Sequence, residues 1–414
     1  MAMLKPLLAC SLLALLAGPQ PAAQGRRTAT IRVSETSGIR RTEYPVRARV
    51  SVPQRALADG SHVRLRVDDG SSTAVPAQYT VAAKWPDASV QSLDVDFNVT
   101  LAPAQMRTYL VEYGPDVAAD AAPRGLAVTE DAAVIQVGNV KFNRSGAPLM
   151  SSATYVRSEF IGQFPEARNG FAVIDRMGTR HDLSTAEALN AEIIERGPLA
   201  VVLRYSGSLS IGAGYAVPFT LMLEMPNSKS WVKLSASVND PGRRVREIAW
   251  HTPLALGAQP WVWDFGTTRW TYGALRNPAD SVVMSHAAVG DWTVSTGPKG
   301  REQLYETSSI DRSTFGGWGH VQGAKEVVAF AIEGMSTRAG TYRVAIDGEG
   351  QTSFRVAAAA PQLRHELTVY EHFVSTPVQI GAATSPATIL SPLLAVCDRE
   401  QYTKSGVPVP ASVR

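Results

Sequence analysis

The sequence predicts an all-β protein in which a small N-terminal β-barrel is followed by a large antiparallel β-sandwich. Apolar and polar residues alternate through many short segments, which is the pattern of strands that bury one face. The longest match spans residues 93–101, where five apolar residues alternate with four polar ones. The 33 glycines and 26 prolines supply turn residues for roughly twenty or more strands.

The strands are expected one after another along the chain. Alternation occurs at residues 63–67, 93–101, 219–225, 232–238, 248–254 and 342–346. Clusters of Gly, Pro, Asn and Asp bound these runs, which is typical of antiparallel strands joined by turns. One segment differs, because Ser184 can cap a helix and good helix formers follow it. We therefore expect a short helical turn at residues 185–190, with a strand resuming near Glu192.

The N-terminus reads as a signal peptide at residues 1–25. Lys5 is followed by an apolar run at residues 7–17, and Gly18-Pro19 then breaks any helix. The run is too short for a permanent membrane anchor but suits a cleavable export signal. Cys10 lies inside the run rather than after it, which disfavours a lipoprotein. We expect a secreted protein, periplasmic or extracellular, with no membrane span.

Composition places one domain boundary in the mature chain. Residues 116–124 accumulate Ala, Asp and Pro without periodicity. A first β-barrel domain is therefore expected at residues 27–117 and a large sandwich at residues 126–390, a size that all-β domains commonly reach. Residues 399–414 contain Ser, Gly and Pro and are expected to form a linker end or a disordered tail.

The two cysteines and the charge balance narrow the functional classes. Loss of Cys10 with the signal would leave Cys397 alone, which excludes an intramolecular disulfide and favours a buried thiol. No Cys/His cluster has zinc spacing, so we expect no metal site of that kind and no cofactor; the alternative is a metal site built from carboxylates, which the sequence does not reveal. The 40 basic and 37 acidic residues give a net charge of +3. Such a balance argues against a nucleic-acid partner.

Several short elements occur in the order seen in one known family. They are Tyr44-Pro45-Val46, the turn near Asp59-Gly60, Val75-Pro76-Ala77-Gln78, Trp85-Pro86-Asp87-Ala88-Ser89-Val90 and Tyr113-Gly114. In these elements the chain resembles the exo-rhamnogalacturonan lyase-like proteins, which carry a Trp-Pro-Asp-Gly-Ser turn before an alternating strand. Ala88 stands where that family usually has glycine.

The resemblance extends more loosely into the second domain, at Glu195, Gly197-Pro198 and residues 365–373. It implies a small barrel, a central sandwich and polysaccharide lyase chemistry, the β-elimination of acidic plant-type or other uronic polysaccharides. Relatives continue into an α/α toroid that helps to form the active cleft, and this sequence contains no such domain. The resemblance therefore implies an incomplete catalytic unit, with a separate toroid protein as one partner, and transfers no catalytic residue.

One strand carries side chains suited to an acidic glycan. Between residues 363 and 373, alternate positions are mostly apolar, and the opposite face presents Arg364, Glu366, Thr368, Tyr370 and His372. Arginine can neutralise a uronate, while tyrosine and histidine suit proton transfer and sugar stacking. We expect Arg364, Glu366, Tyr370 and His372 to contact carbohydrate. The alternative is an exposed polar face without a ligand.

A second candidate is the run Gly316-Gly317-Trp318-Gly319-His320, interpreted as a glycine-flanked loop. Trp318 and His320 are candidate carbohydrate contacts, and the alternative is a structural turn with Trp318 tucked in. The aromatic stretch at residues 261–272 either forms a surface on which sugars stack or packs in the hydrophobic core. Three groups of arginines form either anion-binding strips or a solvated sheet face. They are Arg47 with Arg49, Arg64 with Arg66, and Arg243 with Arg244 and Arg246.

Two classes of function follow. The first is a secreted carbohydrate-active protein that binds, or acts on, acidic polysaccharide. The second is a non-enzymatic secreted β-scaffold or surface-assembly protein. Fold resemblance does not decide between them, because function depends on sites rather than on folds.

Overall fold

The computed structural model describes residues 25–410, except residues 72, 121–124, 213, 268–270, 289, 311–313, 336, 339 and 376–383. The expected signal peptide lies outside the described residues apart from Gly25, as does Trp270 of the aromatic stretch. Within the described part, no helix is long and apolar enough to cross a bilayer.

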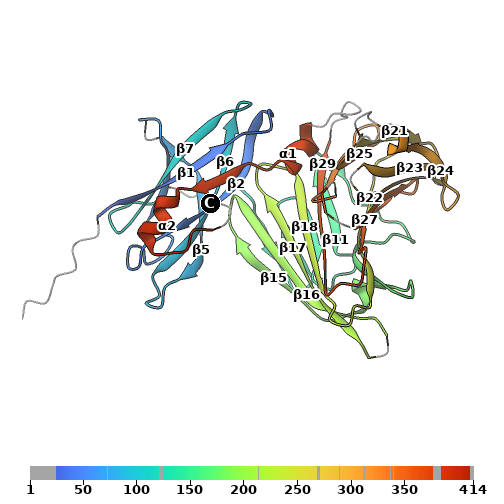
Figure 1. The fold of residues 1–414 in the computed structure, drawn as a ribbon, viewed down its shortest axis with the longest axis horizontal. Helices are drawn as coiled ribbons and strands as arrows, with labels where there is room; N and C mark the ends of the chain where they lie inside the picture. Colours follow the sequence, from blue (N-terminus) through green and yellow to red (C-terminus); the bar gives the residue numbers. More distant parts are fainter. Residues whose placement is uncertain are drawn as a thin grey trace, which may run out of the picture.

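The N-terminal domain is built from two small antiparallel sheets (Figure 1). The first contains, in spatial order, β30 (Leu394–Cys397), β1 (Arg27–Ser34), β7 (Met106–Tyr113), β3 (Val63–Val67) and β4 (Ala74–Val75). The second contains β2 (Arg41–Ser51), β6 (Val90–Leu101) and β5 (Ala77–Lys84). Alternate apolar residues of both sheets meet in one core, where Phe97 packs edge-on against Tyr109 at 4.9 Å between ring centres.

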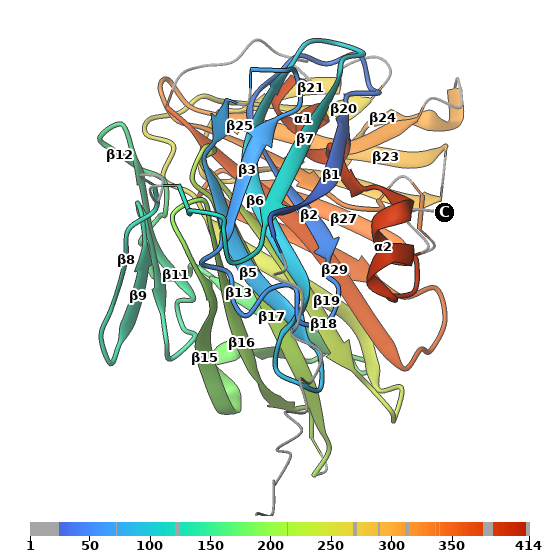
Figure 2. The same cartoon turned by 90° about the vertical axis from the view of Figure 1, so that its left-hand side faces the viewer.

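The rest of the chain forms a large sandwich of two antiparallel sheets, seen beside the N-terminal domain in Figure 1 and behind it in Figure 2. The nine-stranded sheet, as described, contains β15 (Ala186–Arg196), β16 (Ala200–Ser210), β17 (Ala216–Pro226), β18 (Trp231–Asn239), β29 (Arg364–Val374), β26 (Val327–Ile332), β25 (Phe315–Gln322), β20 (Trp261–Thr267) and β21 (Thr271–Leu275). The eight-stranded sheet, counted over the same described residues, contains β14 (Arg180–Asp182), β13 (Gly170–Asp175), β19 (Val245–Pro253), β28 (Gln351–Ala357), β27 (Thr341–Asp347), β22 (Asp280–Ala288), β23 (Asp291–Pro298) and β24 (Gln303–Thr307).

Aromatic contacts join the two sheets of the sandwich. Phe330 of the nine-stranded sheet packs on Phe354 of the eight-stranded sheet at 5.2 Å, and Phe219 packs on Phe171 at 5.6 Å. Phe219 belongs to the alternating apolar set of β17, whereas Phe171 and Phe330 lie on strands that are buried along their whole length. These contacts confirm the predicted all-β fold class.

A further antiparallel sheet flanks the sandwich. It contains β12 (Ser158–Glu159), β11 (Met150–Tyr155), β10 (Val140–Asn143), β9 (Val134–Val137) and β8 (Val128–Glu130). Phe160, beside this sheet, packs on Phe373 of β29 at 5.4 Å, and Tyr155 stacks on the same ring at 6.0 Å. These contacts attach the added sheet to the main core.

The C-terminal segment returns to the N-terminal domain. After β29 and helix α1 (Thr384–Leu390), strand β30 pairs with β1, and helix α2 (Arg399–Ser405) packs on β2 (Figure 1). The expectation of a disordered tail from residue 399 is wrong for α2. Gln401 donates to the carbonyl of Ser51 at 2.8 Å, and the Tyr402 hydroxyl donates to the carbonyl of Arg49 at 3.0 Å. Contacts across such long chain separations leave no local sequence signal.

Cys397 is buried at the end of β30, as expected. Burial raises the pKa of its thiol to about 12, so the thiolate is scarce near neutral pH.

The expected helical turn at residues 185–190 is wrong. The 3-10 turns of the described chain are η1 (Leu183–Thr185) and η2 (Ser308–Ile310), and β15 begins directly after η1 at Ala186. Strand β15 pairs with β16 almost throughout, with an irregularity where Ala188 adopts a φ of +50°. Long-range pairing with β16 therefore overrides the local helix propensity.

The residues around Trp85 form a turn that leads into β6. The amide of Ala88 donates to the carbonyl of Trp85 at 2.9 Å, and the indole N–H of Trp85 donates to the carbonyl of Val52 at 3.0 Å. Ala88 adopts a φ of +66°, a conformation that suits the glycine found there in the resembled family.

We expect Trp85→Ala to lower the free energy of unfolding by about 2 kcal/mol, below the 3–5 kcal/mol typical of a fully buried aromatic residue, because Trp85 is half-buried. Chemical denaturation measures the change. Trp85→Phe is the control: it keeps most of the packing and loses the hydrogen bond to Val52, which is worth about 1 kcal/mol. Unaltered stability of Trp85→Ala would contradict a structural role.

Candidate functional site

All six predicted carbohydrate contacts lie on one face of the nine-stranded sheet. Strand pairing places His372, Ala329, His320 and Asp264 in one cross-strand row, and Tyr370, Ala331 and Trp318 in the next. Directly paired residues share a face, and Arg364 and Glu366 share it with Tyr370 by alternation along β29. We call this the outer face, because the opposite face packs into the sandwich core.

The six residues nevertheless occupy different environments. Arg364 and Glu366 are exposed and form an ion pair of 2.9 Å at one end of the outer face. The Arg364 guanidinium also donates to the hydroxyl of Ser237 at 3.2 Å. An exposed ion pair of this kind contributes little to stability. Arg364 and Glu366 line an open, polar hollow of about 440 Å³.

The expected glycine-flanked loop is wrong, because Trp318 and His320 lie within strand β25 and are buried. A β-carbon at Gly266 would lie 2.0 Å from the Trp318 indole, so the glycines give room to the tryptophan itself. The ring Nδ1 of His320 lies 2.7 Å from a carboxylate oxygen of Asp264. Helix α1 lies beside β25 and β26 (Figure 1), and burial leaves Trp318 and His320 no open face.

His372 lies next to Trp231, which it meets edge-on at 5.8 Å between ring centres. Burial, with the positive charges of Lys229 and His320, lowers the pKa of His372 to about 4. The imidazole is therefore neutral at physiological pH and does not supply a positive charge for an anionic ligand.

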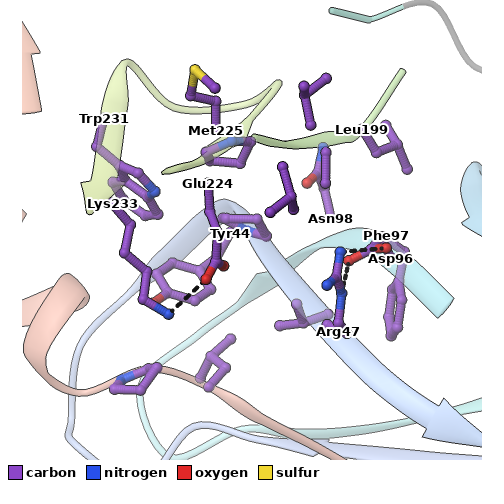
Figure 3. Close-up of a pocket in the computed structure, with 18 of the residues that line it drawn as sticks. Tyr44, Arg47, Asp96, Phe97, Asn98, Leu199, Glu224, Met225, Trp231 and Lys233 are labelled. Carbon is purple, nitrogen blue, oxygen red and sulfur yellow. Dashed lines mark hydrogen bonds and ion pairs between the residues drawn. The ribbon is translucent and has the colours of Figure 1, made fainter. Parts of the chain in front are cut away.

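Tyr370 faces a cavity of about 290 Å³ between the N-terminal domain and the sandwich, the interdomain cavity (Figure 3). Its walls come from both domains and from the returning C-terminal segment. Its main side chains are Tyr44, Arg47, Asp96, Asn98, Glu224, Trp231, Lys233, Tyr370 and Leu393. Clefts between domains are common ligand sites.

Aromatic rings form one wall of the interdomain cavity. Tyr44 of β2 lies 5.9 Å from Trp231 of β18 between ring centres, and its hydroxyl donates to the carbonyl of Thr388 at 2.8 Å. The cross-strand pair Lys233 and Tyr370 adds a third ring, with the ammonium 5.8 Å from the ring centre. These contacts hold the rings in place before any ligand arrives.

Charged groups of the sandwich extend into the same space. Lys233 and Glu224 form an ion pair of 3.2 Å (Figure 3). An ammonium has three donors, and Glu224 takes one of them. Burial raises the pKa of Tyr370, with the charges of Glu333 and Glu224 acting in the same direction, so its hydroxyl stays protonated near neutral pH.

A carboxylate cluster closes the opposite end of the cavity. Arg47 of β2 donates to Asp96 at 2.7 Å and to Glu195 of β15 at 2.6 Å, which joins the two domains. The Gln78 amide donates to Glu195 at 2.6 Å and accepts from the amide of Leu199 at 2.9 Å. Burial and the nearby Glu195 raise the pKa of Asp96, although Arg47 opposes the shift.

The proposed arginine strips are largely neutralised by carboxylates. Arg49 pairs with Asp94 at 2.8 Å, and Arg64 pairs with Glu112. Arg244 lies over the ring of Tyr215 at 4.6 Å. The aromatic stretch is core at Trp261, Trp263 and Phe265, which are all buried.

Sequence reasoning missed Trp231, Lys233 and Tyr44 as cavity residues. The alternating apolar set of β18, at residues 232–238, points inward, so Trp231 and Lys233 point outward. A tryptophan on the polar face of an amphipathic strand was the available signal. Nothing local indicates Tyr44, because the cavity forms when residues far apart in the chain come together.

Among the described residues, no cluster of three or more His, Cys, Asp or Glu side chains is arranged to hold a metal ion.

Fold and site together define an all-β protein with a small N-terminal domain, a large antiparallel sandwich and an aromatic-lined cavity between them. No protein-family model matches the chain, and no curated protein matches it in sequence. Its fold is similar to that of an alpha-mannosidase from Enterococcus faecalis V583, with a TM-score of 0.54 and 12% identity over 89% of this chain and 46% of that one. A protein in the glycosyl hydrolase family 38, also from Enterococcus faecalis, gives a TM-score of 0.54 and 11% identity over 89% and 47% of the two chains.

This chain therefore spans less than half the length of these two solved chains. At such low identity the likeness shows the fold alone. The resemblance to the exo-rhamnogalacturonan lyase-like proteins stays a prediction from the sequence.

Proposed function

We propose that the chain is the β-module of a secreted carbohydrate-active protein and that it binds acidic polysaccharide in the interdomain cavity. The observation that carries the proposal is the cationic Lys233 held over the Tyr370 ring in a cavity that Tyr44 and Trp231 also line. Pyranose faces are apolar and suit aromatic rings, whereas a uronate carboxylate suits the ammonium group of Lys233, which among the described residues donates to Glu224 alone. The names of the two fold neighbours, both carbohydrate-active, are in keeping with this class of ligand.

The size of the cavity limits the ligand. A volume of about 290 Å³ is at the lower end of the range of about 300–1,000 Å³ typical of ligand pockets. One sugar residue, or the end of a chain, would fill it. Asn98 and Glu224 on its walls would meet the hydroxyl edge of such a residue.

A second candidate function, β-elimination, is supported by Asp96. Burial and the nearby Glu195 raise the pKa of its carboxyl group, and a raised pKa favours the proton exchange that general acid or base catalysis requires. Asp96 lines the same cavity as Lys233, so a bound uronate would meet both groups. A separate α/α toroid protein that completes the cleft belongs to this second candidate.

We expect Lys233→Met to weaken binding of uronic oligosaccharides about tenfold or more, because a charge-assisted hydrogen bond contributes about 1.5–3 kcal/mol. Isothermal titration calorimetry of wild type and variant measures the change. Lys141→Met is the matched control, since Lys141 is exposed on β10, away from the cavity.

Neutral oligosaccharides of the same length are the ligand control and should bind more weakly than the acidic ones. Absence of acidic-glycan binding by the wild type would refute the proposal and favour the scaffold alternative. Ultraviolet absorbance of the unsaturated uronate product, followed in the same samples, separates binding from lyase activity.

A further inference from the structure

The outer face of the eight-stranded sheet carries a second cavity, of about 480 Å³, on the opposite side of the sandwich. We call it the arginine cavity. Side chains of β19, β27 and β28 and of the loop before β13 line it, and those at its cationic end are Arg168, His251, Arg343 and Arg355. None of the residues predicted from the sequence as carbohydrate contacts lies here.

Two arginines face each other directly across β27 and β28. Arg343 and Arg355 are register partners, so their β-carbons are about 5 Å apart, and like charges in this position destabilise a sheet. Arg355 pairs with Glu247 at 3.3 Å. Within the described residues, neither Arg343 nor Arg168 forms an ion pair with a carboxylate, but the charge of Arg343 lowers the pKa of Glu302, which also lines the cavity. The buried Nε of Arg355 has no hydrogen-bond partner among the described residues. Carboxylates therefore compensate the positive charge at this end only in part.

His251 adds a buried donor at the same end of the cavity. It is 1% exposed, and its Nε2 lies 2.5 Å from a guanidinium nitrogen of Arg180. A guanidinium donates and cannot accept, so Nε2 is the acceptor and the ring proton lies on Nδ1. That Nδ1 is buried and has no partner among the described residues. An unpaired buried N–H is costly, and an anionic acceptor would satisfy it.

The charges around His251 and Arg355 favour an anionic ligand at this end of the cavity. Burial, together with the charges of Arg180, Arg355 and Arg168, lowers the pKa of His251 well below its ordinary value of 6.5. Burial and the charges of neighbouring arginines also lower the pKa of Arg355, against the effect of Glu247. Burial is the largest cause of both shifts, and the charges of the surrounding arginines act in the same direction.

The other end is different in character. Asp347 lies four residues from Arg343 on β27, about 13 Å along the strand. Lys299 pairs with Asp347 at 2.6 Å, and Glu302 accepts from the Ser281 hydroxyl at 2.6 Å. Carboxylates at this end can accept hydrogen bonds from ligand hydroxyls. The cavity therefore suits a molecule with an oxyanion at one end and hydroxyls at the other.

We propose that the arginine cavity binds a single hexuronate-sized sugar acid, with its carboxylate held by Arg343, Arg355 and the Nδ1–H of His251. This site is separate from the interdomain cavity, and the proposal does not depend on the function proposed there. Arg168, at the rim, contributes positive charge, and Asp347 and Glu302 meet the hydroxyls.

The test uses the purified chain at low salt with galacturonate, neutral galactose and inorganic sulfate as probes. Galacturonate should raise the melting temperature of the wild type and bind in calorimetry, whereas galactose should do neither. Sulfate should compete with galacturonate, because it shares the oxyanion. Arg343→Gln should weaken galacturonate binding at least tenfold.

Arg196→Gln is the matched control, because Arg196 is an exposed arginine that pairs with Glu130 and does not line the arginine cavity. Lys233→Met should leave galacturonate binding at the arginine cavity unchanged, which separates this site from the interdomain cavity. Arg343→Gln should also fold at least as stably as wild type without ligand, since it removes a like-charge contact. Equal galacturonate affinity in Arg343→Gln and Arg196→Gln, equal binding of galactose and galacturonate, or binding of sulfate alone would overturn the proposal.

Discussion

Replacing Trp318 by alanine is expected to lower the free energy of unfolding by about 3–5 kcal/mol, the range typical of truncating a buried aromatic side chain. Trp318 is 8% exposed and belongs to the same hydrophobic cluster as Ile389 and Leu393. Its loss would leave a cavity between β25 and the segment that returns to the N-terminal domain. The close approach of the indole to Gly266 leaves the neighbouring backbone no side chain with which to refill that space.

Chemical denaturation of Trp318→Ala measures this effect, and Tyr272→Ala is the matched control. Tyr272 lies on the same face of the sheet, in register with Asp264, but is 52% exposed. Its truncation should change stability by less than about 1 kcal/mol. A folded Trp318→Ala protein with wild-type stability and weaker glycan binding would make Trp318 a ligand contact and would contradict this reading.

Replacing Glu371 by glutamine is expected to remove a large part of the pH dependence of stability. Glu371 lies in the core between the two sheets of the sandwich, and one of its oxygens accepts from the Trp250 indole at 3.0 Å and from the Thr252 hydroxyl at 2.8 Å. Burial raises its pKa from 4.5 to about 7, although these two hydrogen bonds oppose the shift. The folded protein therefore binds this proton more tightly than the unfolded chain does.

The sign of the effect follows from that difference. The contribution of Glu371 to stability is fully present below about pH 4.5 and is lost as the pH rises to about 7, after which it is constant. The difference in pKa corresponds to about 3 kcal/mol. Glutamine keeps an oxygen that accepts from Trp250 and Thr252 and does not titrate. As the pH rises from acidic to mildly alkaline, the free energy of unfolding of Glu371→Gln should therefore increase by up to about 3 kcal/mol relative to that of wild type.

Denaturation at a series of pH values gives this comparison directly, since other titrating groups are common to both proteins. Glu366→Gln is the control, because Glu366 lies on the same strand but on the exposed face. Its pH profile should parallel that of wild type. A Glu371→Gln profile parallel to wild type would show that Glu371 does not carry the raised pKa.

The fold class could be read from the sequence because it depends on a local property. Residues that are mostly apolar at every second position of β6 and β29 determine which side of each strand faces a core, whatever the partner strands are. The turn at Trp85 is local in the same sense, since its hydrogen bonds join Trp85 to Ala88 and to the nearby Val52. Residues 185–190 were mispredicted because pairing with β16 outweighs helix propensity.

The site could be predicted only in part, for a related reason. Alternation placed Tyr370 and His372 on the outer face of β29, but it carries no information on what covers that face. The returning C-terminal segment and the N-terminal domain cover Trp318 and leave Tyr370 beside a cavity. These contacts join residues hundreds of positions apart, such as Tyr44 and Thr388.

By itself, the sequence determined the all-β class, which side of each strand faces the core, and the buried state of Cys397. The tertiary structure alone decided which outward-facing side chains are solvated, covered or grouped around a cavity. Arg47 shows the physical reason. Its sequence context is that of a solvated arginine, yet folding brings Asp96 and Glu195 to it from two different sheets. Charge, pKa and access to ligand are set by such long-range neighbours, and local periodicity does not encode them.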